Sequence, residues 1–249
     1  MTAARVFSRG WLPTTLLVVA AAAVCVRLGI WQLDRLEQRR AFNREYATAR
    51  KLPVLDLSRP GALDTATMEW RGARAAGIYD AERQVAIRNQ YLDGQYGYHL
   101  LTPLVLSPDR VVLVDRGWIP ADGNDSPNDW RKYDDLGEVV VVGQLRRGAS
   151  KPVVGGVPDT VRSAPDQPLA FWNNLDLERI AAQLPYGILP LFLQPVADGD
   201  PEPPIPSQPE VELTEGPHLG YAAQWFSFAA ILMVGYPIYV RRQVEGAAG

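Results

Sequence analysis

The sequence is poor in the residues that build disulfide, redox and metal centres. Cys25 is its single cysteine, so no disulfide can form within the chain, and with only two histidines, His99 and His218, it cannot assemble an all-protein zinc site. The charge is nearly balanced, with 25 Lys plus Arg against 28 Asp plus Glu. Redox and structural-zinc functions are therefore excluded, and we expect no nucleic-acid partner, because bulk positive charge is missing.

Motifs for common catalytic chemistry are also missing. The chain contains no G-x-S-x-G elbow, no P-loop and no G-x-G-x-x-G. His99 lies in the apolar stretch HLLTPLVL, which favours a hydrogen-bonded structural histidine. Asp134 and Asp135 have no partner motif, which favours a solvated pair over acid–base catalysis. We therefore expect that the protein is not an enzyme; a membrane-anchored hydrolase would need a nucleophile cluster that we do not find.

Two long apolar segments lie near the ends of the chain, and the first follows Gly10. Residues 10–26 carry no charge, and apolar character resumes after Arg27 as far as Leu33. This length predicts a transmembrane helix over residues 11–33. A cleaved signal peptide is the alternative, because two arginines precede the apolar core and small residues resemble a cleavage site. The continued apolarity to Leu33 favours the spanning helix.

The second apolar segment predicts a transmembrane helix over residues 218–240. Residues 216–240 carry no Asp, Glu, Lys or Arg, and residues 221–240 would span ~30 Å as a helix, the thickness of one hydrocarbon core. Tyrosine and tryptophan lie at its ends, as in the aromatic belts of membrane proteins. The alternative is a buried helix in the core of a soluble protein.

The orientation follows from the charges that flank these helices. The approach to the second helix is acidic and its exit carries Arg241 and Arg242, which places the C-terminus in the cytoplasm. The arginines that follow the first helix argue the opposite, but such counts lose force for long loops. We therefore predict cytoplasmic tails at residues 1–10 and 241–249, and an extracytoplasmic domain at residues 34–216 that ends in an acidic, proline-rich spacer at residues 197–217.

The region between the helices has the pattern of β-strands. Residues 71–79 and 84–89 flank a short turn, as do residues 98–106 and 111–118, so each pair is predicted to form a hairpin. Residues 138–145, with four consecutive valines, are typical of a strand that is buried on both faces.

Three further segments complete the expected domain. Residues 188–196 are typical of an edge strand interrupted by Pro190. Residues 177–184 have apolar side chains at helical spacing and predict one helix that covers a face or mouth of the sheet. Residues 121–135 are expected to form an exposed loop. The predicted fold class is an α+β membrane protein: two transmembrane helices flank a mostly antiparallel β domain, an open sheet or barrel with one covering helix.

His218 is the most informative candidate for binding a ligand. It lies at the entrance of the second helix, and helical spacing places Tyr221 and Trp225 on its face. A neutral imidazole there could ligate a haem iron between aromatic rings, although spacing alone favours an interfacial histidine. Arg35, after the first helix, could meet propionates or lipid phosphates, or could be hydrated.

Several segments together resemble one known family. Gly29, Trp31, Gln32 and Arg35 match a G-x-W-Q-x-x-R signature at the exit of the first helix. The stretches YHLLTPL at residues 98–104 and VLVDRGWIP at residues 112–120 match two domain motifs, and HLGYAAQWF at residues 218–226 matches the entrance of the second helix. The chain thus resembles the Surfeit-locus, or Shy-type, family of cytochrome c oxidase assembly proteins.

The resemblance implies a multi-pass protein of the bacterial plasma membrane, or of the mitochondrial inner membrane in a eukaryote, with its domain outside the cytoplasm. It implies that the protein helps haem a reach the catalytic subunit of an aa3-type oxidase, beside the proteins of haem a synthesis and assembly. The family histidine maps to His218, which makes His218, Tyr221, Trp225 and Arg35 the expected haem-binding residues. A scaffolding protein that binds the oxidase without touching haem is the alternative.

Two positions depart from the family pattern. Gly216 and Pro217 precede His218, where family members often carry a polar residue such as Asn, and this leaves open which group supports the histidine. Asp115 stands where many members carry Asn.

Overall fold

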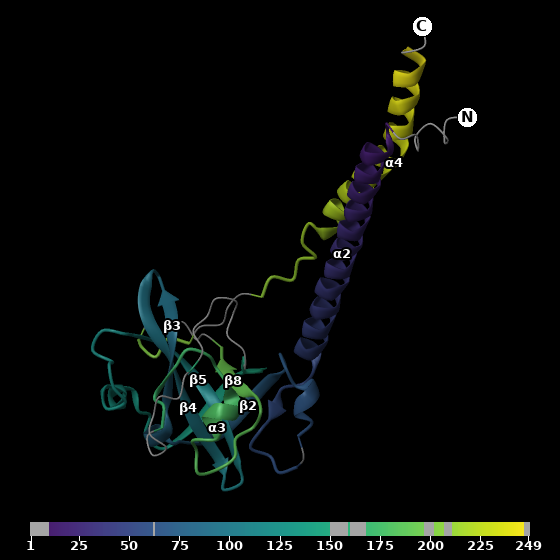
Figure 1. The fold of residues 1–249 in the computed structure, drawn as a ribbon. Coiled ribbons are helices and arrows are strands. Elements are labelled where there is room, and N and C mark those ends of the chain that lie inside the picture. The colour runs from purple at the N-terminus through teal and green to yellow at the C-terminus, as the bar shows by residue number, and fades with distance from the viewer. Residues whose placement is uncertain are drawn as a thin grey trace. The chain divides into compact units, whose positions relative to one another are not determined.

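The structure is a computed structural model that describes residues 10–61, 63–149, 159, 168–196, 202–206 and 211–246. The chain folds into two compact units. In Figure 1 the colour runs from purple at the N-terminus to yellow at the C-terminus. The helical unit consists of Met1–Glu45 and Glu212–Gly249, and the barrel unit of Tyr46–Val211. Most of the predicted N-terminal tail, part of the spacer at residues 197–217 and residues 247–249 of the C-terminal tail lie outside the described residues.

Two long helices form the helical unit. Helix α2 (Leu12–Lys51) continues beyond Leu33, the predicted end of the membrane span, and helix α4 (His218–Gly246) begins at the predicted residue. Both are long and apolar enough to cross a membrane, and only 11% of the most apolar window of each is buried. A helix in a soluble core would be mostly buried, so this exposure favours a lipid environment for the two helices.

Helices α2 and α4 pack side by side in antiparallel fashion (Figure 1). Trp11 lies edge-on to Tyr239 near one end, with ring centroids 6.2 Å apart, and the side chains of Gln32 and His218 meet near the other. Most of the buried residues of the two helices recur every seven positions. This series comprises Thr15, Ala22, Gly29 and Leu36 on α2 and Ala222 and Ala229 on α4; Gln32, Ala49 and Val240 are buried as well but lie outside it. Small residues at such a seam allow helices to approach closely in a membrane.

The barrel unit contains the eight described strands. They are β1 (Leu55–Asp56), β2 (Gly72–Tyr79), β3 (Val85–Leu92), β4 (Gln95–Ser107), β5 (Arg110–Pro120), β6 (Glu138–Arg146), β7 (Phe171–Trp172) and β8 (Phe192–Pro195). The short helices are η1 (Thr65–Thr67), η2 (Ala81–Arg83), η3 (Asp129–Tyr133) and α3 (Leu177–Ala181).

Five of these strands close into a barrel. The sheet order is β1-β2-β6-β8-β5-β4-β3-β7, and β2 also pairs with β4 through Ile78 opposite Val105 and Tyr79 opposite Leu104. Strands β2, β6, β8, β5 and β4 therefore form a closed ring. The predicted fold class is confirmed, with the barrel rather than the open sheet, and closure leaves these strands no free edge.

The core has a part inside the barrel and a part outside it. Alternate residues of the ring strands, such as Val112 and Val114 of β5, face one cluster, and Leu113 between them faces another. The second cluster contains Leu177 and Ile180 of α3. Asp176 caps the start of α3, and its carboxylate accepts a hydrogen bond from the Arg179 amide at 3.2 Å. It covers one outer side of the barrel, as the apolar spacing predicts.

The predicted hairpin between residues 71–79 and 84–89 is wrong, whereas the one between residues 98–106 and 111–118 is confirmed as β4 and β5. Strands β2 and β3 both pair with β4 instead: β3 pairs with the first half of β4, and β2 pairs near its C-terminal end. Helix η2 stands between β2 and β3 and redirects the chain, so the intervening residues do not form a tight hairpin turn.

Two further strand predictions are wrong. Strand β8 is central, because it pairs with β5 on one side and β6 on the other; Pro190 lies before the strand and removes no ladder hydrogen bond. Strand β6 is not buried on both faces. Val141 is 8% exposed, whereas Val140 and Val142 are 53% and 50% exposed. Valine favours any pleated strand, so a run of valines does not reveal how many faces are covered.

The expected exposed loop at residues 121–135 is partly buried. It contains η3, and the side chain of Trp130 is fully buried among Ala86, Leu100 and Ile119. Its indole nitrogen donates to the Asn124 carbonyl at 3.2 Å. One aromatic side chain therefore anchors a segment whose composition otherwise indicates a loop.

Candidate functional site

His218 is the first residue of α4, and its ring is held by α2. Its Nδ1 lies 2.8 Å from Oε1 of Gln32. An amide oxygen only accepts hydrogen bonds, so Nδ1 carries the proton and donates it. In a neutral imidazole with this tautomer, Nε2 keeps its lone pair. This is the arrangement in which histidine binds a metal ion, with the other ring nitrogen tied to a fixed acceptor.

The Nε2 edge of the ring lies beside the backbone of Gly216. Gly216 adopts φ 68°, in the left-handed region that glycine tolerates best. A Cβ placed on it would stand 3.3 Å from Cδ2 and 3.4 Å from Nε2 of His218. A larger residue at position 216 would therefore crowd this edge of the imidazole, and glycine leaves it less covered.

The segment before His218 is bound along α2. Arg39 donates from Nη2 to the carbonyl of Glu212 at 3.0 Å, and Asn43 donates to that of Leu213 at 3.0 Å. Arg40 forms a two-pronged ion pair with the Glu215 carboxylate, with both N–O distances 2.9 Å. These contacts fix the point at which the chain enters α4 and hence the register that places His218 opposite Gln32.

The other predicted ligand-binding residues lie on the same two helices. Trp225 is half-buried and stands edge-on to Phe228 at 5.9 Å, and Tyr221 is 48% exposed. Arg35 is exposed; it donates to Gln38 at 2.9 Å and lies 5.6 Å from the ring centroid of Trp31. The direct side-chain partner of His218 is thus Gln32, and the assignment of the other three to a haem stays a prediction.

Sequence reasoning included Gln32 in a motif but assigned it no role. Its position within G-x-W-Q-x-x-R marked it as part of a signature. The pairing with His218 depends on the antiparallel register of two helices that are far apart in the sequence. Only the packed helices reveal that register.

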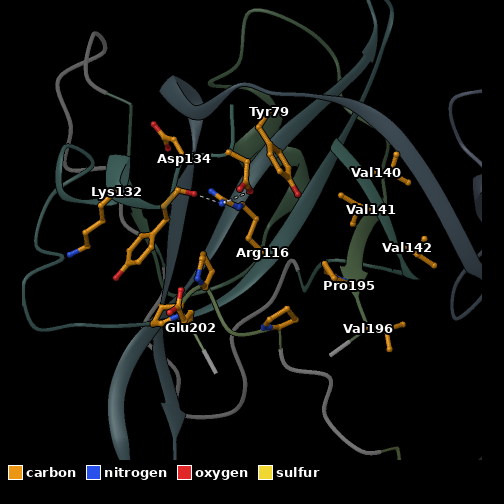
Figure 2. Close-up of a pocket in the computed structure, with 15 residues that line it drawn as sticks. Tyr79, Arg116, Lys132, Asp134, Val140, Val141, Val142, Pro195, Val196 and Glu202 are labelled. Atoms are coloured by element: carbon orange, nitrogen blue, oxygen red, sulfur yellow. Dashed lines mark hydrogen bonds and ion pairs between the residues drawn. The ribbon is translucent and has the colours of Figure 1, made fainter. Parts of the chain in front are cut away.

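A second region of interest is a groove of about 720 Å³ on the barrel (Figure 2). Figure 2 shows Arg116 between the loop residues Lys132 and Asp134 on one side and the valines of β6 on the other. Arg116 is 7% exposed, donates to the Asp135 carboxylate at 2.8 Å and also donates to the Tyr133 carbonyl.

Tyr79 completes the surroundings of Arg116 in this groove. Its ring centroid lies 5.0 Å from the guanidinium carbon. Burial raises the pKa of Tyr79 to about 12, although the nearby Arg116 charge acts in the opposite direction, so the phenol stays protonated at neutral pH. The contacts of Arg116 join the η3 loop to the barrel wall, which makes it a structural residue of the groove.

His99 is the other histidine of the chain, and it pairs with Asp115. Its Nδ1 lies 2.9 Å from the Asp115 carboxylate, and both side chains are largely buried. Burial by itself lowers the pKa of His99, but the carboxylate outweighs it and the pKa is raised. The prediction of a hydrogen-bonded structural histidine is confirmed by this contact.

Comparison with known proteins decides the family. The family model described as the SURF1 family matches residues 19–230, which include most of α2, the whole barrel unit and the first part of α4. The chain belongs to the SURF1 family. The resemblance that the sequence motifs indicate is therefore confirmed. The SURF1 family is one of cytochrome oxidase assembly factors and is generally not catalytic.

Relatives of this SURF1 family protein come from Mycobacterium, Rickettsia and Caenorhabditis. An uncharacterized SURF1-like protein of Mycobacterium tuberculosis is 27% identical over 247 residues, which cover 95% of this chain and 85% of the relative. A SURF1-like protein of Rickettsia felis is 23% identical, with 93% and 99% covered, and one of Caenorhabditis briggsae is 23% identical, with 90% and 74% covered. The similarity to these relatives thus extends over nearly the full length of this chain.

Proposed function

We propose that this SURF1 family protein assists the insertion of haem a into the catalytic subunit of an aa3-type cytochrome c oxidase, with His218 as the residue that holds the haem iron in transit. The observation that supports this most directly is the 2.8 Å contact between His218 and Gln32, which leaves the lone pair of Nε2 to bind the iron. Haem a is the cargo in this proposal and not a resident cofactor.

The location of His218 suits such a cargo. Haem a carries an isoprenoid tail that belongs in lipid and propionates that belong in water. His218 lies where the apolar α4 begins, directly after the polar segment that Arg39, Arg40 and Asn43 bind. A ligand at that boundary can place each part of the haem in its preferred medium. Delivery also requires release, which a single histidine permits more readily than two.

We propose the plasma membrane as the location, with the barrel unit outside the cytoplasm. The basic exit of α4 favours a cytoplasmic C-terminus. The edge contact of Trp11 with Tyr239 brings the start of α2 close to the end of α4, which supports placing both tails on one side. The catalytic oxidase subunit and the haem a synthesis and assembly proteins are the partners that this arrangement would serve.

An absorption spectrum tests the proposed function. The full-length protein is purified in detergent from cells that synthesise haem a, with His218→Ala and His99→Gln prepared in parallel. We expect His218→Ala to retain much less haem a than the parent, and His99→Gln to retain the parental amount, because His99 is occupied by Asp115.

Two results would overturn the haem role. Equal haem content in the parent and His218→Ala would remove His218 as the ligand. A parent that co-purifies with the oxidase and shows no haem spectrum would instead identify a scaffolding protein.

A further inference from the structure

We propose that Gln32 is a positioning residue that sets the tautomer of His218 and thereby directs Nε2 to the ligand. This inference rests on the proposed function of His218 in holding haem a. It adds a residue from α2 to a site that the sequence places at the entrance of α4, so that the site requires both helices.

The contact between the two side chains carries the tautomer assignment. With 2.8 Å between Nδ1 and Oε1, the hydrogen bond is short and requires the proton on Nδ1. A histidine side chain in water places most of its neutral population in the other tautomer, with the proton on Nε2. Gln32 therefore biases the ring towards the form that can bind iron through Nε2.

The position of Gln32 makes it a fixed acceptor. It is 9% exposed and lies seven residues before Arg39, which binds the segment that enters α4. Leu36, one turn further along α2, is 4% exposed in the same seam. The amide is therefore held by packing, and the ring it binds cannot rotate without the loss of a partly buried hydrogen bond.

Gly216 makes the opposite edge of the ring usable. Glycine has no Cβ, and a Cβ at this position would lie 3.4 Å from Nε2 of His218. The support for His218 comes from Gln32 of α2, across the seam between the two helices. Hydrogen bonds of this kind raise the basicity of the ligand, and their loss costs about 10- to 100-fold in metal affinity.

The first arm of the test needs no haem. The chain has two histidines, so ¹⁵N-labelled histidine yields signals from only two rings, and His99→Gln assigns them. The full-length parent in detergent should show His218 protonated at Nδ1. Gln32→Met, which keeps the length but removes the acceptor, should shift His218 towards the Nε2–H form. Gln32→Glu restores an acceptor and should restore the Nδ1–H form.

The second arm titrates the same proteins with ferric haem and follows the Soret band. We expect Gln32→Met to raise the Kd about 10- to 100-fold and Gln32→Glu to return it towards the parental value. Gln243→Met is the matched control, because Gln243 is exposed near the end of α4, away from His218, and its substitution should leave both readouts unchanged.

The outcomes separate this inference from the proposed function. Parental tautomer and parental Kd in Gln32→Met, together with weak binding in His218→Ala, would overturn the role of Gln32 and keep His218 as the ligand. Equal haem binding in His218→Ala and the parent would overturn the proposed function, whatever the tautomer. Circular dichroism of each variant checks that the helices remain folded.

Discussion

Gly29 of α2 lies against the ring of Phe226 on α4, so closely that a Cβ built on Gly29 would stand 2.8 Å from two of its ring carbons. The glycine belongs to the seven-residue series of buried positions on α2. It permits the helix approach on which the pairing of Gln32 with His218 depends.

Gly29→Leu should therefore separate the two helices. We expect a loss of about 1–3 kcal/mol from overpacking, seen as a lower midpoint of thermal denaturation in detergent. Gly235→Leu on α4 is the control, because nothing lies within 4 Å of a Cβ at that position. Similar midpoints for the two variants would show that the seam tolerates a large residue and would contradict the packing described.

The pair of His99 and Asp115 predicts a pH-dependent stability. Asp115 raises the pKa of His99 in the folded protein. The folded state therefore holds the His99 proton more tightly than the unfolded state, and protonation stabilises the fold. This contribution is fully present below the unfolded pKa of about 6.5 and is lost as the pH rises through the folded value. Urea unfolding of the full chain at a series of pH values should show stability falling over that window.

Asp115→Asn tests whether the carboxylate causes this dependence. The amide removes the negative charge and keeps the shape, so the fall in stability above the unfolded pKa should become shallower. An unchanged pH profile in this variant would assign the dependence to another group.

Arg116 should contribute to stability through the loop it anchors. Arg116→Met removes the donors for the Asp135 carboxylate and the Tyr133 carbonyl. We expect a loss of about 1–3 kcal/mol, measured by urea unfolding monitored through tryptophan fluorescence. Arg131→Met is the control, since Arg131 is exposed on the same loop and should change stability by less than about 0.5 kcal/mol. A parental unfolding midpoint for Arg116→Met would contradict the anchoring role.

Trp130 tests the correction to the loop at residues 121–135. Trp130→Ala should cost about 3–5 kcal/mol, because a fully buried indole is lost; Trp130→Phe is the milder variant if the alanine form does not fold. Leu136→Ala is the control, as Leu136 is 95% exposed. If the two alanine variants unfold at the same urea concentration, Trp130 is not a core residue.

Local patterns account for the parts of this protein that were predictable. The two candidate membrane helices follow from the length of the uncharged segments, and the strands follow from short apolar runs between turns, since both signals reside in neighbouring residues. The position of His218 at the start of α4 was predictable for the same reason, because the residues next to it mark where the helix begins. Predictions that concerned pairing or coverage were less successful, as for the hairpin of β2 and β3 and for the two faces of β6.

The sequence alone determined that this chain has two lipid-compatible helices around a β-rich domain and one histidine at a helix entrance, because hydropathy and spacing are local properties. The tertiary structure decided that β2 closes the barrel by pairing with both β4 and β6, and that Gln32 meets His218. Both depend on contacts between residues far apart in the chain, whose register is set by the packing of whole elements and not by the residues on either side.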